Sequence, residues 1–315
     1  MTFDFNDIPD LSGRIALVTG GNTGIGEATV RHLAAHGARV YMGARSSDKA
    51  ATAIARIKEA HPSADVRHLQ MDHMSLASVK AAANTFTSLE SELHILVNNA
   101  GIMGTELQIS KDGNEAQWQT NYLAHWLLTK LLLPLIISTA EKAPRGAVRI
   151  VNVSSSRHKL FAPKEGIRFK NTALDNESKM TRYGQSKLAN VLHAKTLDAL
   201  YGPGSEHAQH HGPILTASLH PGAVDTQLNT QVSVKGMGWV NPVLKCAGVF
   251  SDPDDGAMAS LFCASAKEFS EDMSGKYFDS KAKVINPSDL ARNQGLRDEL
   301  EAWTTAKMKS EGWIE

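Results

Sequence analysis

Short apolar runs alternate with longer segments of mixed polarity along most of the chain. The runs that predict strands are residues 14–19, 39–43, 66–70, 94–98, 148–153, 215–219 and, less distinctly, 276–278. Segments with apolar residues at helical spacing separate these runs, at residues 28–36, 48–60, 76–89, 117–137 and 184–200. Strand–helix alternation of this kind predicts a parallel sheet with helices on both faces.

Several predicted strands are apolar almost throughout, such as RIALVT at 14–19 and VRIVNV at 148–153. Strands covered on both faces show this pattern, because neither face meets water. We find no repeat and no low-complexity linker, so we expect one α/β domain over residues 1–315, with a doubly wound, mostly parallel, seven-stranded sheet. A polar insertion at 156–181 and a Gly- and Pro-interrupted apolar stretch at 227–251 are typical of binding loops.

Composition narrows the class of protein. The chain has 33 Lys plus Arg and 33 Asp plus Glu, and this zero net charge argues against a nucleic-acid partner. Cys246 and Cys263 have no metal-like neighbours and predict reduced thiols in a cytoplasmic protein. The most apolar stretch, residues 123–138, contains Lys130 and Pro134 and falls short of the roughly 20 apolar residues of a membrane span, so we expect a buried helix and no transmembrane segment.

A glycine-rich turn, TGGNTGIG at 19–26, joins the first predicted strand to the first predicted helix. Backbone N–H groups at a helix N-terminus can face a pyrophosphate, and glycines let that group come close. Many turns contain glycine only for its positive φ angles, which is the alternative interpretation. The strand–turn–helix context favours a dinucleotide site formed by Gly20, Asn22, Thr23, Gly24, Ile25 and Gly26.

The second predicted strand ends at YMGAR, where an NAD enzyme would carry Asp or Glu for the ribose 2′-hydroxyl. Here Arg45 and Ser46 follow instead, and no carboxylate would repel a phosphate. A guanidinium suits a 2′-phosphate, so we expect NADP(H) to be preferred over NAD(H). The alternative is a solvated surface arginine.

Tyr183 and Lys187, in YGQSK, stand four residues apart and would share one face of a helix. A cation beside a phenol lowers the phenol's pKa, and a tyrosine tuned in this way can exchange a proton with a substrate oxygen. Tyr-x-x-x-Lys alone is common by chance, so the interpretation depends on the motifs around it.

Six motifs occur in order along the chain: TGGNTGIG at 19–26, NNAG at 98–101, Asn121 in QTNYLAHWLLT, VNVSS at 151–155, YGQSK at 183–187 and HPGAV at 220–224. Through them the chain resembles the short-chain dehydrogenase/reductase family over nearly its whole length. It looks most like the branch of retinol dehydrogenases and WW-domain oxidoreductases. The resemblance implies a Rossmann-type NAD(P)-binding fold and a hydride carrier that makes a catalytic metal unnecessary.

The resemblance also implies roles for individual residues. Tyr183 would be the general acid/base, and Lys187 would bind the nicotinamide ribose. Ser155, rather than Ser154, would hydrogen-bond the reacting oxygen, and Asn121 would anchor a water molecule for proton relay. Further cofactor contacts would come from Asp72, His73, Asn98, Ala100, Gly101, Pro221, Gly222, Val224 and Thr226. Relatives usually carry Leu where this chain has His73.

Substrate residues are less sharply indicated. Trp239 and Leu244 belong to the apolar stretch that follows the cofactor-side loop, and we expect them in a substrate lid, with plain core or a membrane-touching patch as alternatives. The insertion with His158 would form another pocket wall or a surface excursion. His207, His210 and His211 lack an acidic or cysteine ligand set, so we expect a solvated loop there and no metal site.

These observations predict an NADP(H)-dependent oxidoreductase that interconverts a carbonyl and an alcohol on a lipophilic small molecule. A non-catalytic NADP-binding redox sensor or scaffold is one alternative. C=C reduction or dehydration by a member of the same family is another. Relatives commonly form homodimers or homotetramers through the helices that would hold residues 114–137 and 182–201.

Overall fold

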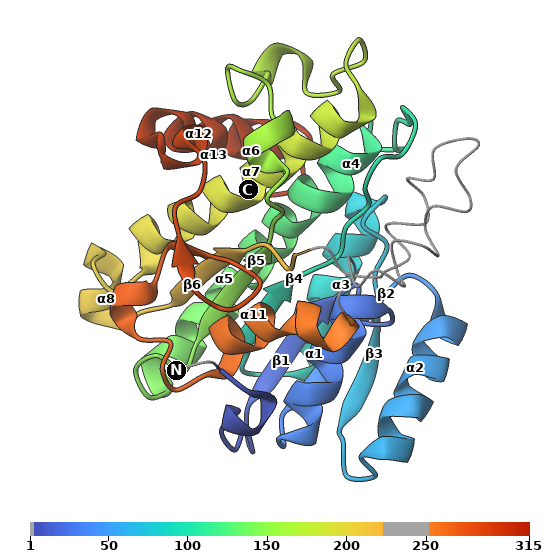
Figure 1. Ribbon diagram of the computed structural model, residues 1–315, viewed down its shortest axis with the longest axis vertical. Helices are drawn as coiled ribbons and strands as arrows, with labels where there is room; N and C mark the ends of the chain where they lie inside the picture. The colour runs from blue at the N-terminus through green and yellow to red at the C-terminus, as the bar shows by residue number, and fades with distance from the viewer. Residues whose placement is uncertain (1–2, 223–251) are drawn as a thin grey trace.

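The computed structural model describes residues 3–222 and 252–315, and an eight-stranded sheet lies at its centre (Figure 1). The strand order is β3-β2-β1-β4-β5-β6-β7-β8. Neighbouring strands from β3 to β7 are parallel, and β8 pairs antiparallel with β7 at the edge. The strands are β1 (Ile15–Thr19), β2 (Arg39–Ala44), β3 (Val66–Gln70), β4 (Ile95–Asn98), β5 (Arg149–Val153), β6 (Leu215–Leu219), β7 (Lys276–Phe278) and β8 (Val284–Ile285).

The predicted doubly wound, mostly parallel sheet is confirmed, and each predicted strand is found with its ends within one residue of expectation. The number of strands was wrong, because β8 makes the sheet eight-stranded. This strand has only two residues, Val284 and Ile285, which is too short a run to show the alternation that predicts a strand.

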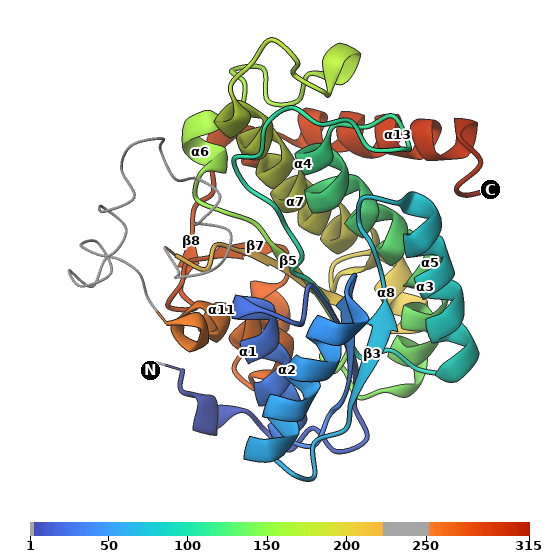
Figure 2. The ribbon, with the colours of Figure 1, turned by 90° about the vertical axis from the view of Figure 1, so that its right-hand side faces the viewer.

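Helices cover both faces of the sheet, as Figure 2 shows with α1 and α2 on one side and α3 and α5 on the other. One buried cluster joins the sheet to α1, α2 and α11, and a second joins it to α3, α5 and α7. The long helices are α1 (Gly24–Ala35), α2 (Ser47–Ala60), α3 (Leu76–Leu89), α5 (Ala124–Lys142), α7 (Lys179–Tyr201), α11 (Pro253–Ser265) and α13 (Gln294–Ser310). Shorter helices are η1 (Phe5–Asp7), α4 (Ala116–Trp118), α6 (His158–Phe161), η3 (Phe169–Asn171), α8 (Glu206–His211), η4 (Glu271–Met273) and α12 (Asp289–Arg292).

Two helical segments differ from expectation in ways that bear on function. The segment predicted at 117–137 contains a π-helical turn, η2 (Gln119–Leu123), between α4 and α5. Such turns are rare and are frequent at functional sites. The predicted solvated loop with three histidines was wrong, since residues 206–211 form α8, where Ser205 caps the first turn by accepting from Ala208 N.

The helical segment Ala116–Lys142 is the one stretch, among the described residues, that is long and apolar enough to cross a membrane. Two thirds of its most apolar window (67%) is buried inside the protein, as in the core helix of a globular domain. The C-terminal helix α13 contributes to this burial. Trp126 Nε1 donates to Glu301 over 2.8 Å, and the hydroxyls of Tyr122 and Thr304 lie 2.7 Å apart.

The sheet order places a crevice at the carboxyl end of β1. The chain leaves β1 toward α1 on one face, whereas the neighbouring strand β4 leads to helices on the other face. Ligands of open parallel sheets bind at such a switch point, outside the carboxyl ends of the strands. The glycine-rich turn begins at this edge, directly after Thr19.

Gly26 provides a test of how tightly this turn is packed. A Cβ atom at Gly26 would lie 2.2 Å from the backbone oxygen of Gly20 and 2.5 Å from Asn99 Nδ2. We expect Gly26→Ala to lower the free energy of unfolding by about 1–3 kcal/mol, because the backbone of the turn must shift. Urea denaturation measures the change. Gly204→Ala is the control, since a Cβ there meets nothing within 4 Å, and equal midpoints for the two variants would contradict the packing described.

Candidate active site

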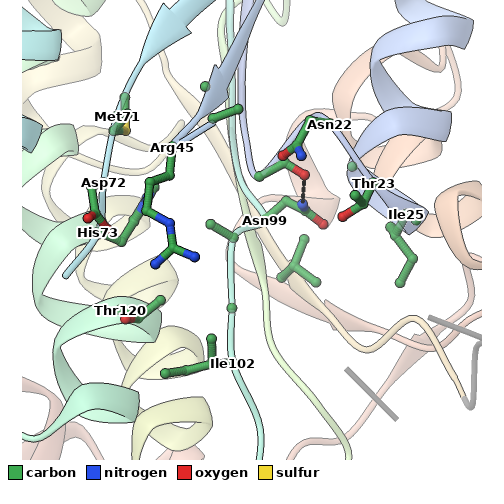
Figure 3. Close-up of a pocket in the computed structure, with 18 of the residues that line it drawn as sticks. Asn22, Thr23, Ile25, Arg45, Met71, Asp72, His73, Asn99, Ile102 and Thr120 are labelled. Atoms are coloured by element: carbon green, nitrogen blue, oxygen red, sulfur yellow. Dashed lines mark hydrogen bonds between the residues drawn. The ribbon is translucent and has the colours of Figure 1, made fainter. Parts of the chain in front are cut away.

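A cavity of about 320 Å³ opens at the carboxyl edge of the sheet, between the glycine-rich turn and α7 (Figure 3). Most of the residues expected to bind the cofactor line it. They are Gly20, Asn22, Thr23, Gly24, Ile25, Gly26, Arg45, Asp72, His73, Ala100, Gly101, Tyr183, Lys187 and Pro221. Residues that the sequence reasoning did not single out also contribute, namely Gly43, Ala44, Met71, Met74, Asn99, Ile102, Thr120 and Val153. Ser154, which the sequence reasoning placed second to Ser155, lines the cavity as well.

Some expected cofactor residues are not among those that line the cavity. Ser46 instead caps α2, with its side chain accepting from Lys49 N. Gly222 lies close to Ser280, to which a Cβ added at the glycine would come within 3.2 Å. The expected residues Val224, Thr226, Trp239 and Leu244 lie outside the described residues.

Of the two neighbouring asparagines in NNAG, Asn99 lies at the turn and Asn98 does not. Asn98 ends β4, and its Nδ2 donates inside the core to Asn152 Oδ1 over 2.8 Å and to Thr129 Oγ1 over 3.1 Å. Asn99 Nδ2 donates to Thr19 O over 2.8 Å and so holds the start of the turn. The strand prediction contained the signal for this assignment, because it ended at residue 98 and left Asn99 as the first residue beyond the sheet.

The glycine-rich turn presents the N-terminus of α1 to the cavity. Gly20 and Gly24 have φ angles of 63° and 54°, which side chains disfavour. Thr23 is the N-cap residue, yet its side chain makes no capping hydrogen bond. The first N–H groups of α1 therefore lack a side-chain acceptor, and this arrangement favours binding of an anion such as a phosphate.

Arg45 extends from the end of β2 into the cavity, opposite Thr23 and Ile25 (Figure 3). Its backbone oxygen accepts from Gln70 Nε2 over 2.8 Å, which fixes the start of the side chain. None of the ion pairs found among the described residues includes its guanidinium. A cation placed in this way is suited to a second phosphate group, apart from the one that the N-terminus of α1 would bind.

A buried hydroxyl connects the strand ends to the helices behind the cavity. Thr19 Oγ1 accepts from the backbone N–H of Asn99 and of Ala100, each over 2.9 Å, and lies 2.8 Å from His125 Nε2. The hydroxyl therefore donates its one proton toward His125, whose Nδ1–H in turn donates to Asn121 O over 2.9 Å. This chain of bonds ties β1 and β4 to the π-helical turn.

Asn121 uses its whole side chain to join two segments. Its Oδ1 accepts from Ile102 N over 2.8 Å, and its Nδ2 donates to Ile102 O over 3.0 Å and to Ser186 Oγ over 2.9 Å. The residue is fully buried and is not among those that line the cavity. Its side chain thus holds the segment after β4 against α7, beside Lys187.

Tyr183 and Lys187 lie on α7, with Lys187 Nζ 5.8 Å from the centre of the Tyr183 ring. Lys187 Nζ donates to Val153 O over 2.9 Å, and burial lowers the pKa of Lys187 to about 7. Burial also raises the pKa of Tyr183, against the opposing effects of the Ser155 hydroxyl and the Arg157 charge. The expected lowering of the Tyr183 pKa by Lys187 is not observed, because burial outweighs the charges around the phenol.

The two serines after β5 have different surroundings. Ser154 is buried, and its hydroxyl donates to Lys187 O over 2.6 Å. Ser155 does not line the cavity, but it lies near enough to Tyr183 for its hydroxyl to oppose the rise in the phenol's pKa. Ser155 is therefore the serine that accompanies Tyr183.

Two buried histidines, His73 at the cavity and His193 behind it, are held neutral. Burial lowers the pKa of His73 to about 4 and that of His193 to about 3. The ring of His73 packs edge-on against His125, with centroids 4.8 Å apart. His193 Nδ1 lies 3.4 Å from Asn152 Nδ2 and can accept from it. These histidines place no charge in the core at neutral pH, although His73 Nε2 has no hydrogen-bond partner among the described residues.

Comparisons with known proteins agree with this geometry. A family model described as short chain dehydrogenase matches residues 14–165. Short-chain dehydrogenase/reductase drtF of Aspergillus calidoustus is 50% identical over 304 residues, covering 96% of this chain and 96% of that protein. The crystal structure of a Mycobacterium paratuberculosis protein matches with a TM-score of 0.73 at 26% identity and 98% coverage of both chains. The Pseudomonas aeruginosa RhlG/NADP active-site complex matches with a TM-score of 0.65 at 25% identity, covering 86% of this chain and 95% of that one.

The buried histidines predict loss of stability in acid. His193 has a pKa of about 3 when folded and 6.5 as its ordinary value, so between these values the unfolded chain binds a proton that the folded chain excludes. The stability is therefore present above pH 6.5 and falls as the pH drops toward 3. At pH 4.5 this one group accounts for a loss of about 2–3 kcal/mol.

Urea unfolding at pH 7.5 and pH 4.5 checks this prediction. We expect the loss between the two pH values to be smaller in His193→Gln than in the wild type, by about 2 kcal/mol. His210→Gln, a change at an exposed histidine, is the control and should keep the wild-type loss. An equal pH dependence in all three proteins would show that His193 is not held neutral.

Proposed function

Since the chain belongs to the short-chain dehydrogenase/reductase family, we propose that it is an NADP(H)-dependent enzyme that interconverts a carbonyl and an alcohol on a lipophilic small molecule. The single observation that carries this proposal is the cavity itself. One continuous cavity reaches from the N-terminus of α1 to Tyr183 and Lys187 on α7. It therefore offers an anion site at one end and a proton donor at the other.

The residues around the cavity fit a dinucleotide. The N–H groups at the start of α1 suit the pyrophosphate, and the absence of a side chain at Gly26 lets the turn pack closely on Gly20 and Asn99. Gly101 lies near Lys187, because a Cβ added at the glycine would be 3.4 Å from Nζ. Lys187 would donate to the ribose hydroxyls beside it. Arg45 would pair with the 2′-phosphate, and the RhlG structure in its NADP complex is a neighbour in fold.

The chemistry follows from where protons and hydrogen-bond donors lie. When bound, the reduced dinucleotide supplies a hydride to the carbonyl carbon. The Tyr183 phenol keeps its proton at neutral pH, since burial raises its pKa, and this is the form needed to protonate the substrate oxygen. Ser155 and Tyr183 would both donate to that oxygen and stabilise its developing charge.

We propose supporting roles for the remaining candidates. Asn121 would act by holding the segment after β4 against α7. Trp239 and Leu244 would supply apolar contacts to the substrate. Membership of the branch of retinol dehydrogenases and WW-domain oxidoreductases is part of the same proposal. A cytoplasmic location and a homodimeric or homotetrameric assembly remain part of the proposal.

Replacement of Tyr183 tests the proposed acid. We expect Tyr183→Phe to lower the rate of NADPH-dependent carbonyl reduction by about 10²–10⁴-fold, because the proton donor is lost. NADPH binding, measured by fluorescence titration, should change little. Tyr201→Phe is the control, since Tyr201 is a half-buried tyrosine on the same helix whose ring packs on His207. Tight NADPH binding with no turnover by the wild type on a carbonyl panel would favour a sensor instead.

Replacement of Arg45 tests the cofactor preference. We expect Arg45→Ala to weaken NADPH binding by about 10–100-fold, the value of a charge-assisted contact of about 1.5–3 kcal/mol, and to leave NADH binding unchanged. Isothermal titration with both dinucleotides measures the two affinities. Arg56→Ala is the control, because Arg56 is an exposed arginine of α2 paired with Glu27. An equal loss for both dinucleotides in Arg45→Ala would contradict the 2′-phosphate contact.

A further inference from the structure

His158 lies three residues after Ser155, in the insertion expected to form a pocket wall or a surface excursion, and it is buried, with 1% of its surface exposed. We propose that His158 is a positioning residue that fixes the Ser155 turn against the segment after β8, and so sets where the Ser155 hydroxyl lies beside Tyr183. This inference rests on the proposed function, because it assigns His158 to the placement of a proposed substrate-binding serine.

Both ring nitrogens of His158 have defined partners. Nδ1 lies 2.6 Å from Ser155 O, and Nε2 lies 3.2 Å from the backbone nitrogen of Ser288. A backbone N–H can only donate, so Nε2 must be the acceptor and the ring must be neutral. The proton is then on Nδ1 and is donated to Ser155 O. Only this tautomer satisfies both contacts.

Neighbouring contacts hold the ring in this orientation. The edge of His158 packs on Tyr277, with centroids 5.2 Å apart and planes at 87°. Lys159 Nζ donates to Asn286 O over 2.6 Å and lies 5.9 Å from the centre of the Tyr277 ring. The turn that carries Ser155 is thus joined to residues 286–288 at two adjacent points.

Ser155 is constrained from both sides along the chain. Ser154, before it, is bonded through its N–H to Leu219 O over 2.7 Å and through its hydroxyl to Lys187 O over 2.6 Å. After it, Ser155 O accepts from His158 twice, from the backbone N–H over 3.2 Å and from Nδ1 over 2.6 Å. Of the two bonds to Ser155 O, only the one from the His158 ring can be removed by changing the side chain of residue 158.

Loss of the ring contact would free the Ser155 hydroxyl to move. This hydroxyl already accepts from Arg157 N over 3.3 Å, a bond that would draw it into the turn and away from the phenol. Displacement of a reacting or orienting group by about 1 Å can cost up to about 100-fold in rate. The effect should therefore fall on turnover rather than on NADPH binding.

Three substitutions separate the two ring contacts. In His158→Asn the amide nitrogen can take the place of Nδ1–H and donate to Ser155 O. In His158→Gln the longer side chain can bring its oxygen to the place of Nε2 and accept from Ser288 N, without a donor for Ser155. His158→Ala removes both contacts. Lys159→Met is the control, because it breaks the neighbouring bond to Asn286 and leaves Ser155 O with its partners.

We expect kcat for carbonyl reduction to fall by about 10–100-fold in His158→Ala and His158→Gln, and to return to near the wild-type value in His158→Asn. Lys159→Met should keep the wild-type kcat, and NADPH affinity should be unchanged in all four variants. An unchanged kcat in His158→Ala would overturn the proposal. So would a loss in which all three His158 variants fall in parallel with their unfolding midpoints, since that pattern shows a merely structural role.

Two spectroscopic measurements test the placement without enzymatic activity. Long-range ¹H–¹⁵N spectra of the wild type should show His158 protonated on Nδ1, and a proton on Nε2 would overturn the arrangement. In protein labelled with ¹³C at tyrosine Cζ, the Tyr183 signal should shift in His158→Ala and His158→Gln but not in His158→Asn. If these results hold and the wild type reduces no carbonyl, the proposed function fails while the positioning of Ser155 stands.

Discussion

The hydroxyl of Thr19 holds together the edge of the sheet on which the cavity is built. It accepts hydrogen bonds from the backbone N–H groups of Asn99 and Ala100 and donates one to His125, which is bonded to Asn121 O. The hydroxyl therefore connects β1, the segment after β4 and the π-helical turn. A buried polar group without a partner costs about 1–3 kcal/mol, and the loss of this one hydroxyl would leave several such groups unpaired. The glycine-rich turn, the NNAG segment and Asn121 consequently keep fixed positions relative to one another.

Burial disfavours charge on the polar groups that line the cavity or lie behind it. His73, His125 and His193 all have pKa values lowered by burial, and the pKa of Lys187 is lowered for the same reason. The protonation of the site is therefore set mainly by exclusion of water, and only secondarily by neighbouring charges.

The sequence predicts the sheet and the location of the site well, because both depend on local patterns. Apolar runs such as RIALVT and the turn at 19–26 carry their signal within a few residues. The roles of Thr19 and His158 could not be predicted in this way, since each depends on a partner that is distant in the chain, at the end of another strand or in the segment after β8. The direction of the Tyr183 pKa shift was missed for a related reason, because burial is a property of the folded chain.

Helix α13 has a consequence for self-association. Its buried residues Leu296, Leu300 and Met308 belong to the same apolar cluster as α5 and α7, the helices through which relatives were expected to pair. Helix α13 therefore covers part of a surface of α5 and α7 through which two copies of the chain could otherwise pair. Any symmetric contact between subunits must either use the area of α5 and α7 that α13 leaves open, include α13 itself, or be formed on another side of the molecule.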